Sequence, residues 1–252
     1  MLTRMCCNSG MYNGKKISAV FGTYREKKSI GKAIDDLFAT GFVDEVVVVN
    51  NNAEEGTDRE VKKTEAKLFY ETRQGYGWAY KRAMKEATGD YIITSEADGT
   101  FRAKDIERLL VYSKEYDVVL GSRTSLIGSL EGIDGMNMLR KFANVIEAKT
   151  IEILFNTNAL TDVGCTLKLF KRSAYNKLKK IWNKESALFN TEIVLLAVRE
   201  RIPFVEVPVA YCKRVGKSQI VTSFYLEIKW AFVIQIYILY MWLRWILAKL
   251  FK

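Results

Sequence analysis

Segments with strand and helix composition alternate over residues 17–121 of this chain of 252 residues. The segment 45–50 contains four consecutive valines, which is typical of a strand buried on both faces. Strands that alternate with helices predict a mostly parallel α/β sheet flanked by helices, with right-handed crossovers. The predicted strands are 17–22, 45–50, 67–71, 91–94 and 117–121, and the predicted helices are 29–40, 77–88 and 103–114.

The second half of the chain repeats this pattern less regularly and ends in an apolar segment. Residues 128–158 are predicted to be mostly helical, and the later elements are a strand at 165–170, a helix at 188–201 and a strand at 204–209. The segment Trp230–Leu243 is apolar on all sides apart from Gln235, and it extends to Ala248 with Arg244 as an interruption. A helix over these nineteen residues is about 28 Å long, close to the thickness of a bilayer's hydrocarbon core.

This apolar segment has three interpretations. Lys229, Lys249 and nearby tryptophans flank it, as at a membrane interface, so it either spans a membrane or lies in the interfacial plane. The third interpretation is a long core or dimerisation helix. We therefore predict an N-terminal extension at 1–15, which lacks the apolar core of a signal peptide, a catalytic domain at 16–222 and a C-terminal membrane helix at 223–252.

Two carboxylates directly follow the apolar run 91–93. They are Glu96 and Asp98, one residue apart, and Gly99 allows the chain to bend there. In an open α/β sheet, ligands bind beyond the carboxyl ends of the strands. The spacing indicates a site for a hard divalent cation with a phosphate ligand, and the alternative is a solvated turn.

Composition narrows the chemistry further. The chain has 39 Lys and Arg residues against 29 Asp and Glu residues, which gives a net charge of +10. Such a charge suits phosphorylated substrates, anionic lipids or nucleic acid as partners, and the alternative is that it serves only solubility. The absence of histidine excludes Ser-His-Asp triads, Cys-His pairs and histidine-based zinc sites. The four cysteines form no CxxC pair, which indicates a reduced, cytosolic compartment. No GxGxxG follows the first strand and no Walker motif occurs, which argues against dinucleotide dehydrogenases and P-loop enzymes.

Several motifs occur in the order found in glycosyltransferase family 2, which has the GT-A fold. The chain resembles this family from about Lys16 to Ser218, and Glu96-Ala97-Asp98 stands where the family has its D-x-D motif. The most similar branch is dolichol-phosphate mannose synthase and related polyprenyl-phosphate glycosyltransferases. The stretches that carry the resemblance are 17–26, 47–57, 74–79, 121–123, 161–172, 205–209 and 214–218.

The resemblance implies an inverting, metal-dependent enzyme at the cytoplasmic face of a membrane. It would transfer a sugar from a UDP- or GDP-linked donor to a polyprenyl or dolichyl phosphate. The acceptor nucleophile is then a phosphate oxygen that is already anionic at neutral pH, so a general base is dispensable and a site without histidine suffices.

The resemblance also assigns roles to individual residues. For the metal, Mg²⁺ or Mn²⁺, Asp98 is the expected direct ligand, with Glu96 and Thr100 beside it, and the expected catalytic residues are Asp98, Arg123, Asp162 and Glu192. The expected donor-binding residues are Thr23, Tyr24, Glu26, Asn50, Gln74, Gly75, Glu96 and Ala97. The residues expected to bind the acceptor phosphate or the pyrophosphate are Arg123, Arg140, Arg214, Lys217 and Ser218.

Two other functions stay open at this point. A glycan or protein hydroxyl acceptor would need a base, for which Glu192 or Asp162 would be required. A non-catalytic membrane module that binds nucleotide or anionic lipid is suggested by Asn50, Asn51 and Glu96, where this chain departs from the family pattern. The expected partners are a nucleotide sugar, a polyprenyl or dolichyl phosphate and membrane lipids, with no nucleic acid; the oligomeric state is open.

Overall fold

A single seven-stranded sheet organises the protein in this computed structural model, which describes residues 12–124, 136, 138–216 and 223–250. The strand order is β3-β2-β1-β4-β6-β5-β7, and β6 is antiparallel to both of its neighbours while the other pairs are parallel. The strands are β1 (Ile17–Thr23), β2 (Glu45–Asn50), β3 (Lys67–Tyr70), β4 (Tyr91–Thr94), β5 (Val118–Ser122), β6 (Lys168–Lys171) and β7 (Phe204–Pro208).

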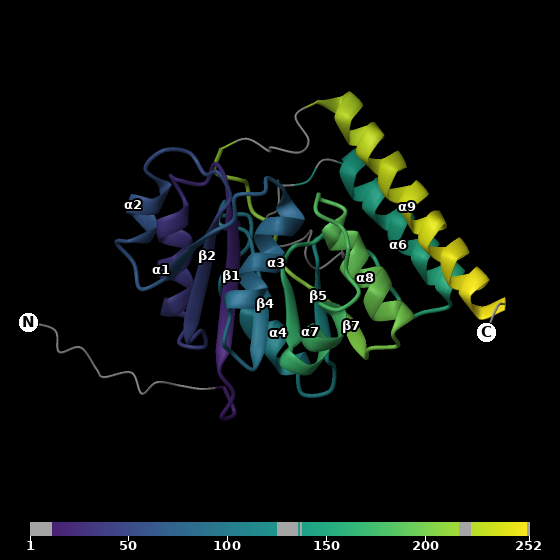
Figure 1. The fold of residues 1–252 in the computed structure, drawn as a ribbon, viewed down its shortest axis with the longest axis horizontal. Helices are drawn as coiled ribbons and strands as arrows, with labels where there is room; N and C mark the ends of the chain where they lie inside the picture. The colour runs from purple at the N-terminus through teal and green to yellow at the C-terminus, as the bar shows by residue number, and fades with distance from the viewer. Residues whose placement is uncertain (1–11, 125–135, 137, 217–222, 251–252) are drawn as a thin grey trace, which may run out of the picture.

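Helices pack against both faces of this sheet (Figure 1). Two short ones, α2 and α7, were not predicted from the sequence. The helices are α1 (Ile30–Ala39), α2 (Thr57–Val61), α3 (Tyr76–Glu86), α4 (Asp105–Tyr112), α6 (Met138–Phe155), α7 (Arg172–Leu178), α8 (Phe189–Arg199) and α9 (Phe224–Leu250).

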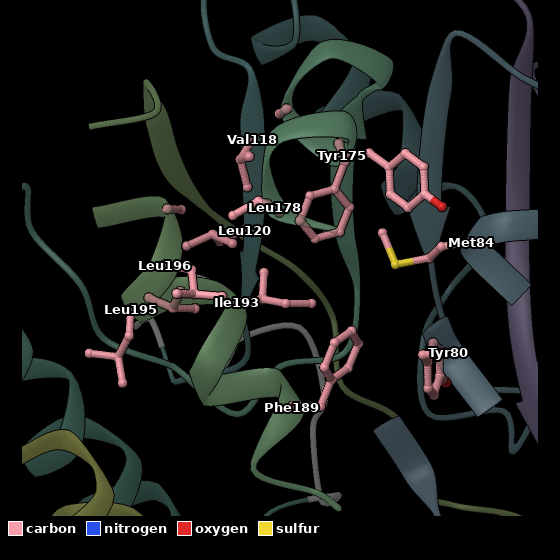
Figure 2. Packing of buried hydrophobic residues seen from close by; sticks show 14 of the residues in the cluster. Tyr80, Met84, Val118, Leu120, Tyr175, Leu178, Phe189, Ile193, Leu195 and Leu196 are labelled. Carbon is pink, nitrogen blue, oxygen red and sulfur yellow. The ribbon is translucent and has the colours of Figure 1, made fainter. Parts of the chain in front are cut away.

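The valines of β2 show why the sheet has two covered faces. Successive side chains of a strand point to opposite sides. Val47 and Val49 join the apolar cluster that contains α3, α7 and α8, whereas Val46 and Val48 join the cluster that contains α1 and α4. Figure 2 shows the first of these clusters from close by, with aromatic and aliphatic side chains from several helices packed together. The predicted mostly parallel sheet with flanking helices is confirmed.

All strands except β6 run in one direction, so their carboxyl ends meet at the same edge of the sheet. The chain leaves this edge after β1, β2, β4, β5 and β7. Because β6 runs the opposite way, the segment that precedes it arrives at the same edge. The sequence predicted this strand at 165–170, but it begins only at Lys168, so residues 161–167 form a loop beside the other loops.

The C-terminal helix α9 packs along α6 at one side of the molecule (Figure 1). It begins at Phe224, six residues before the predicted apolar run. Within the described ranges it is the one helix long and apolar enough to cross a membrane, by length and composition alone. Its contacts with the domain are spaced along its length: Glu227 with Arg140, Gln235 with Thr150, and Trp245 with Phe155.

Glu45 is a buried carboxylate at the opposite end of the sheet from the loops described above. Its side chain accepts hydrogen bonds from Ser18, Lys67 and Thr88, including the Thr88 backbone N–H at 2.8 Å. Burial acts to raise the pKa of Glu45, but these donors outweigh it and lower the pKa to about 2. The stabilisation is therefore complete above the ordinary pKa of 4.5 and is lost as the pH falls towards 2.

We predict that Glu45→Gln lowers the free energy of unfolding by about 1–3 kcal/mol at pH 7, because a charged acceptor is lost from a buried set of donors. The difference from the wild type should shrink at pH 3. Urea unfolding at both pH values measures it, with Asp36→Asn as a control, since Asp36 pairs with Lys32 on the surface. Equal stabilities of the Glu45 variant and the wild type at pH 7 would contradict this account.

Candidate active site

The two carboxylates that follow β4 share one cation in this structure. Arg214, from the loop after β7, places Nη2 3.1 Å from Oε2 of Glu96 and Nη1 2.7 Å from Oδ2 of Asp98. Asp98 is buried, and Arg214 is partly buried. The guanidinium thus lies between two acids that the sequence places one residue apart.

Each carboxylate is also oriented by hydroxyl groups. Thr100 donates to Oδ1 of Asp98 from its backbone N–H at 2.9 Å and from its hydroxyl at 2.5 Å. Oε1 of Glu96 accepts from the Thr166 hydroxyl at 2.6 Å, and Thr166 in turn contacts the Tyr76 hydroxyl at 2.8 Å. Oδ2 of Asp98 is buried and, apart from its ion pair with Arg214, accepts no hydrogen bond from the described residues.

The charges of the pair act on each other. Burial and the neighbouring charge of Glu96 raise the pKa of Asp98. For Glu96, burial also acts to raise the pKa, but the charge of Arg214 and the hydrogen bond from Thr166 outweigh it and lower the pKa. A cation placed between the two acids relieves this repulsion, and Arg214 already does so in part.

These residues fit a hard divalent cation. Oxygen ligands suit Mg²⁺ and Mn²⁺, and Asp98 Oδ2 is a buried oxygen that accepts no hydrogen bond and faces the Arg214 guanidinium, whose place a cation could take. Within the described ranges, no three acidic or cysteine side chains are grouped closely enough to hold a metal ion. The remaining ligands would therefore come from water and from phosphate oxygens of a bound nucleotide. Thr100, predicted to lie near the metal, uses its hydroxyl to fix Asp98.

A cavity of about 370 Å³ opens beside the carboxylates. Its walls come from the ends of β1 and β4 and from the start of α3. Glu26 shapes one wall, because its carboxylate accepts from the Thr23 hydroxyl and from the backbone N–H groups of Tyr24 and Arg25. Most of the predicted donor-binding residues line it: Thr23, Tyr24, Glu26, Gln74, Glu96 and Ala97.

Two predicted donor-binding residues do not line this cavity. The Asn50 amide donates to Asp58 at 2.6 Å, and its oxygen accepts from the backbone of Ala53. Asn51 lines the cavity instead and is buried. Its amide oxygen accepts from the Gly75 backbone N–H at 2.9 Å, so Gly75 supports the wall through Asn51.

A second cavity of about 330 Å³ lies next to the first. Tyr76, Glu96 and Arg214 line both cavities. Arg123 and Arg140 face the second cavity, together with apolar side chains of α6 and α9 such as Leu139, Trp230, Phe232 and Ile234. It therefore combines arginine side chains with apolar helical walls, which suits an anionic head carried on an apolar chain.

Arg123 is held rigidly at this second cavity. Asp162 accepts its Nε at 2.7 Å and its Nη2 at 2.8 Å, and also accepts the Arg123 backbone N–H. Asp162 is buried, and the charge of Arg123 lowers its pKa against the effect of burial. The two side chains are thus one unit in which Asp162 orients the guanidinium. Arg140 forms a separate ion pair with Glu227 at 2.7 Å.

Glu192, predicted to be catalytic, does not join the other site residues. Its carboxylate accepts from the backbone N–H groups of Asn183 and Lys184 and from the Tyr237 hydroxyl at 3.2 Å. It therefore fixes a loop and one face of α9, and it lines a different cavity. Lys217 and Ser218, predicted to contact phosphate, lie outside the described residues.

Sequence reasoning missed several residues of the two cavities. Asn190 on α8 donates to the Tyr76 hydroxyl at 2.8 Å, which extends the chain of hydrogen bonds that ends on Glu96. Glu147 on α6 lines the second cavity. Neither Asn190 nor Glu147 belongs to a motif. Tyr76 lies in the glycine-rich turn at 74–79, so a sequence signal could have identified it.

Comparison with known proteins agrees with this geometry. The sequence model of Glycosyl transferase family 2 matches residues 18–179. The chain belongs to glycosyl transferase family 2. The resemblance seen in the sequence motifs is thereby confirmed, and the protein is a glycosyltransferase.

Two curated relatives are similar in sequence to this chain. Dolichyl-phosphate beta-glucosyltransferase of Saccharomyces cerevisiae is 26% identical in an alignment of 190 positions, which covers 66% of this chain and 56% of that protein. Dolichyl-phosphate hexose transferase of Haloferax volcanii is 22% identical over 210 residues, 83% of this chain and 88% of that protein. The chain thus spans little more than half of the yeast protein.

A solved structure of glucosyl-3-phosphoglycerate synthase from Mycobacterium tuberculosis has a similar fold. It was determined in complex with Mn²⁺, UDP and glucosyl-3-phosphoglycerate, and the match covers 82% of this chain and 74% of the synthase chain. The TM-score is 0.62 at 15% sequence identity, so the similarity is one of fold. The predicted GT-A fold of this glycosyltransferase is confirmed.

We predict that Gly75→Ala damages the first cavity of this glycosyltransferase. A Cβ at Gly75 would lie 2.6 Å from the Glu185 carbonyl oxygen, closer than carbon and oxygen approach, so the turn would have to move. We expect a loss of about 1–3 kcal/mol in unfolding free energy. Gly31→Ala is the matched control, because no atom lies within 4 Å of its added Cβ. Thermal unfolding of both variants compares them, and an equal effect would contradict the steric argument.

Proposed function

We propose that this glycosyltransferase transfers a sugar from a uridine or guanosine diphosphate sugar to a polyprenyl or dolichyl phosphate, with inversion at the sugar. The observation that carries the proposal is the pair of adjacent cavities that share Glu96 and Arg214. One has a carboxylate corner for a metal–pyrophosphate group. The other has arginines among its lining residues and apolar walls. The names of the yeast and archaeal relatives support the same class of acceptor.

The residues of the site suit this reaction. In the first cavity, Glu96 and Asp98 would hold Mg²⁺ or Mn²⁺, which supplies positive charge to the departing nucleoside diphosphate. In the second, Arg123, oriented by Asp162, would bind the acceptor phosphate, because a guanidinium fork matches phosphate oxygens and stays charged. A phosphate oxygen needs no general base, and a direct displacement by it inverts the sugar carbon.

The same geometry disfavours a hydroxyl acceptor. Such an acceptor needs a base, and the two carboxylates considered for that role are engaged elsewhere. Asp162 makes three hydrogen bonds with Arg123, and Glu192 accepts backbone N–H groups outside the two cavities. Neither Asp162 nor Glu192 is therefore free to act as that base, which favours a phosphate acceptor.

We also propose that α6 and α9 lie in the plane of the membrane at its cytoplasmic face. The contacts of α9 with the domain run from Glu227 to Trp245, which corresponds to about 27 Å of helix and leaves no free length to cross a bilayer. Both helices expose large apolar side chains, which would face the lipid. They include Met138, Phe142, Ile146 and Ile153 on α6, and Phe232, Ile236, Leu239, Leu243, Leu247 and Leu250 on α9.

The carboxylate corner formed by Glu96 and Asp98 can be tested by substitution. Asp98→Asn should lower sugar transfer by at least about 100-fold, because a direct ligand of the metal is lost. The assay measures radiolabelled lipid formed from UDP- and GDP-sugars, a polyprenyl phosphate and Mn²⁺. Asp35→Asn, an exposed position on α1, is the control and should retain wild-type activity. Full activity in the Asp98 variant would remove it from the site, and failure of the wild type with every donor would refute the proposed function.

The exposed apolar residues of α6 allow a test of membrane association. Phe142→Glu, on the exposed apolar face of α6, should weaken flotation with lipid vesicles, because a charge is costly to place in an apolar interface. Val111→Glu is the matched control, since Val111 is also exposed but belongs to α4 on the other face of the sheet. Alkaline carbonate should release the wild type from membranes. Retention after carbonate, or equal flotation of both variants, would contradict the in-plane arrangement.

A further inference from the structure

Glu147 is a buried carboxylic acid on α6 that the reaction described above does not use. Its side chain lines the second cavity, and the residue is only 4% exposed. Within the part of the chain that the structure describes, no hydrogen bond or ion pair engages its carboxyl group. Buried carboxyl groups normally have partners, so an acid left open to a cavity points to a ligand.

The cationic groups around Glu147 are each matched by another acid. Arg123 is paired with Asp162, Arg140 with Glu227, and Arg214 with Glu96 and Asp98. The other titratable groups that face this cavity are the hydroxyls of Tyr76 and Tyr211. An ionised Glu147 would therefore add an uncompensated negative charge to a cavity proposed to receive a phosphate.

The surroundings keep this acid neutral at pH 7. Burial, followed by the negative charge of Asp162, raises the pKa of Glu147 to about 8, although Arg123 acts in the opposite direction. A protonated carboxyl group has an O–H that can donate a hydrogen bond, whereas a carboxylate can only accept.

We propose that the side chain of Glu147, which lines the second cavity beside Arg123 and has no partner there among the described residues, donates a hydrogen bond from its carboxyl O–H to a phosphate oxygen of the lipid acceptor. This inference rests on the proposed function, because it assumes that a phosphate enters the second cavity. No proton is transferred: the O–H stays on Glu147 and contacts an oxygen that does not attack the sugar. Glu147 thereby complements the arginines, which supply charge, with a donor that adds none.

The proposal makes a specific prediction for the pH dependence. The KM for the polyprenyl phosphate should rise as the pH passes about 8, since Glu147 then loses its proton and repels the phosphate. The KM for the nucleotide sugar should not rise in parallel, because the donor occupies the other cavity. The acceptor KM of the wild type is measured from pH 6.5 to 9.5 with saturating donor and Mn²⁺.

Three variants test the assignment. Glu147→Gln keeps the size and an N–H donor but does not titrate, so its acceptor KM should stay low and should lose the rise above pH 8. Glu147→Leu removes the donor and should raise the acceptor KM about tenfold at pH 7, with little change in the donor KM. Glu152→Gln is the matched control, since Glu152 lies on the same helix outside the cavity and pairs with Lys149.

The outcomes separate this inference from the proposed function. If the wild type transfers sugar and Glu147→Gln keeps the wild-type rise above pH 8, or if Glu147→Leu keeps the wild-type acceptor KM, the inference on Glu147 is wrong and the function stands. If the wild type transfers sugar to no polyprenyl phosphate and calorimetry detects no binding of one, both are wrong. Circular dichroism and thermal unfolding check that the Leu variant is folded; the near-isosteric Gln variant decides if it is not.

Discussion

The ion pair that Arg214 forms with Glu96 and Asp98 holds the site together. Asp98 is buried and Glu96 is partly buried; the two acids repel each other, and a cation between them relieves this repulsion. Arg214 is separated from Glu96 by 118 positions in the sequence, so this contact also ties the loop after β7 to the end of β4. A divalent metal would take over the role of the guanidinium, and Arg214 would then be available for phosphate.

The direction of the strands explains how such distant residues meet. Because all strands but one are parallel, the loops after β1, β4, β5 and β7 all lie at one edge of the sheet. The exception, β6, brings the loop before it to this edge, and that loop supplies Asp162 to Arg123 and Thr166 to Glu96. The antiparallel strand therefore brings in the loop that orients Glu96 of the carboxylate corner and Arg123 of the second cavity. The helices α6 and α9 then close the second cavity with apolar side chains.

Much of this arrangement could be predicted from the sequence, because long apolar runs and motifs mark strands and loops. β2 and β4 have the predicted bounds, whereas α2 and α7 are only 5 and 7 residues long, too short to show a helical period. The site residues that the sequence placed wrongly or missed have a different explanation, which is that their positions depend on tertiary structure. Asn50 and Asn51 are adjacent, and only the turn after β2 decides which one faces the cavity. Glu147 is an acid on the buried side of α6, and its role depends on a cavity that α6 forms together with α8, α9 and loops far away in the sequence.

The central claim is that the carboxylate corner binds a nucleoside diphosphate together with a divalent metal. Isothermal titration calorimetry of UDP and GDP, each with and without Mn²⁺, tests it most directly. The account predicts that one of the two nucleotides binds at least about tenfold more tightly when Mn²⁺ is present, because the metal bridges the carboxylates and the phosphates. Equal affinity with and without Mn²⁺ for both nucleotides would contradict it.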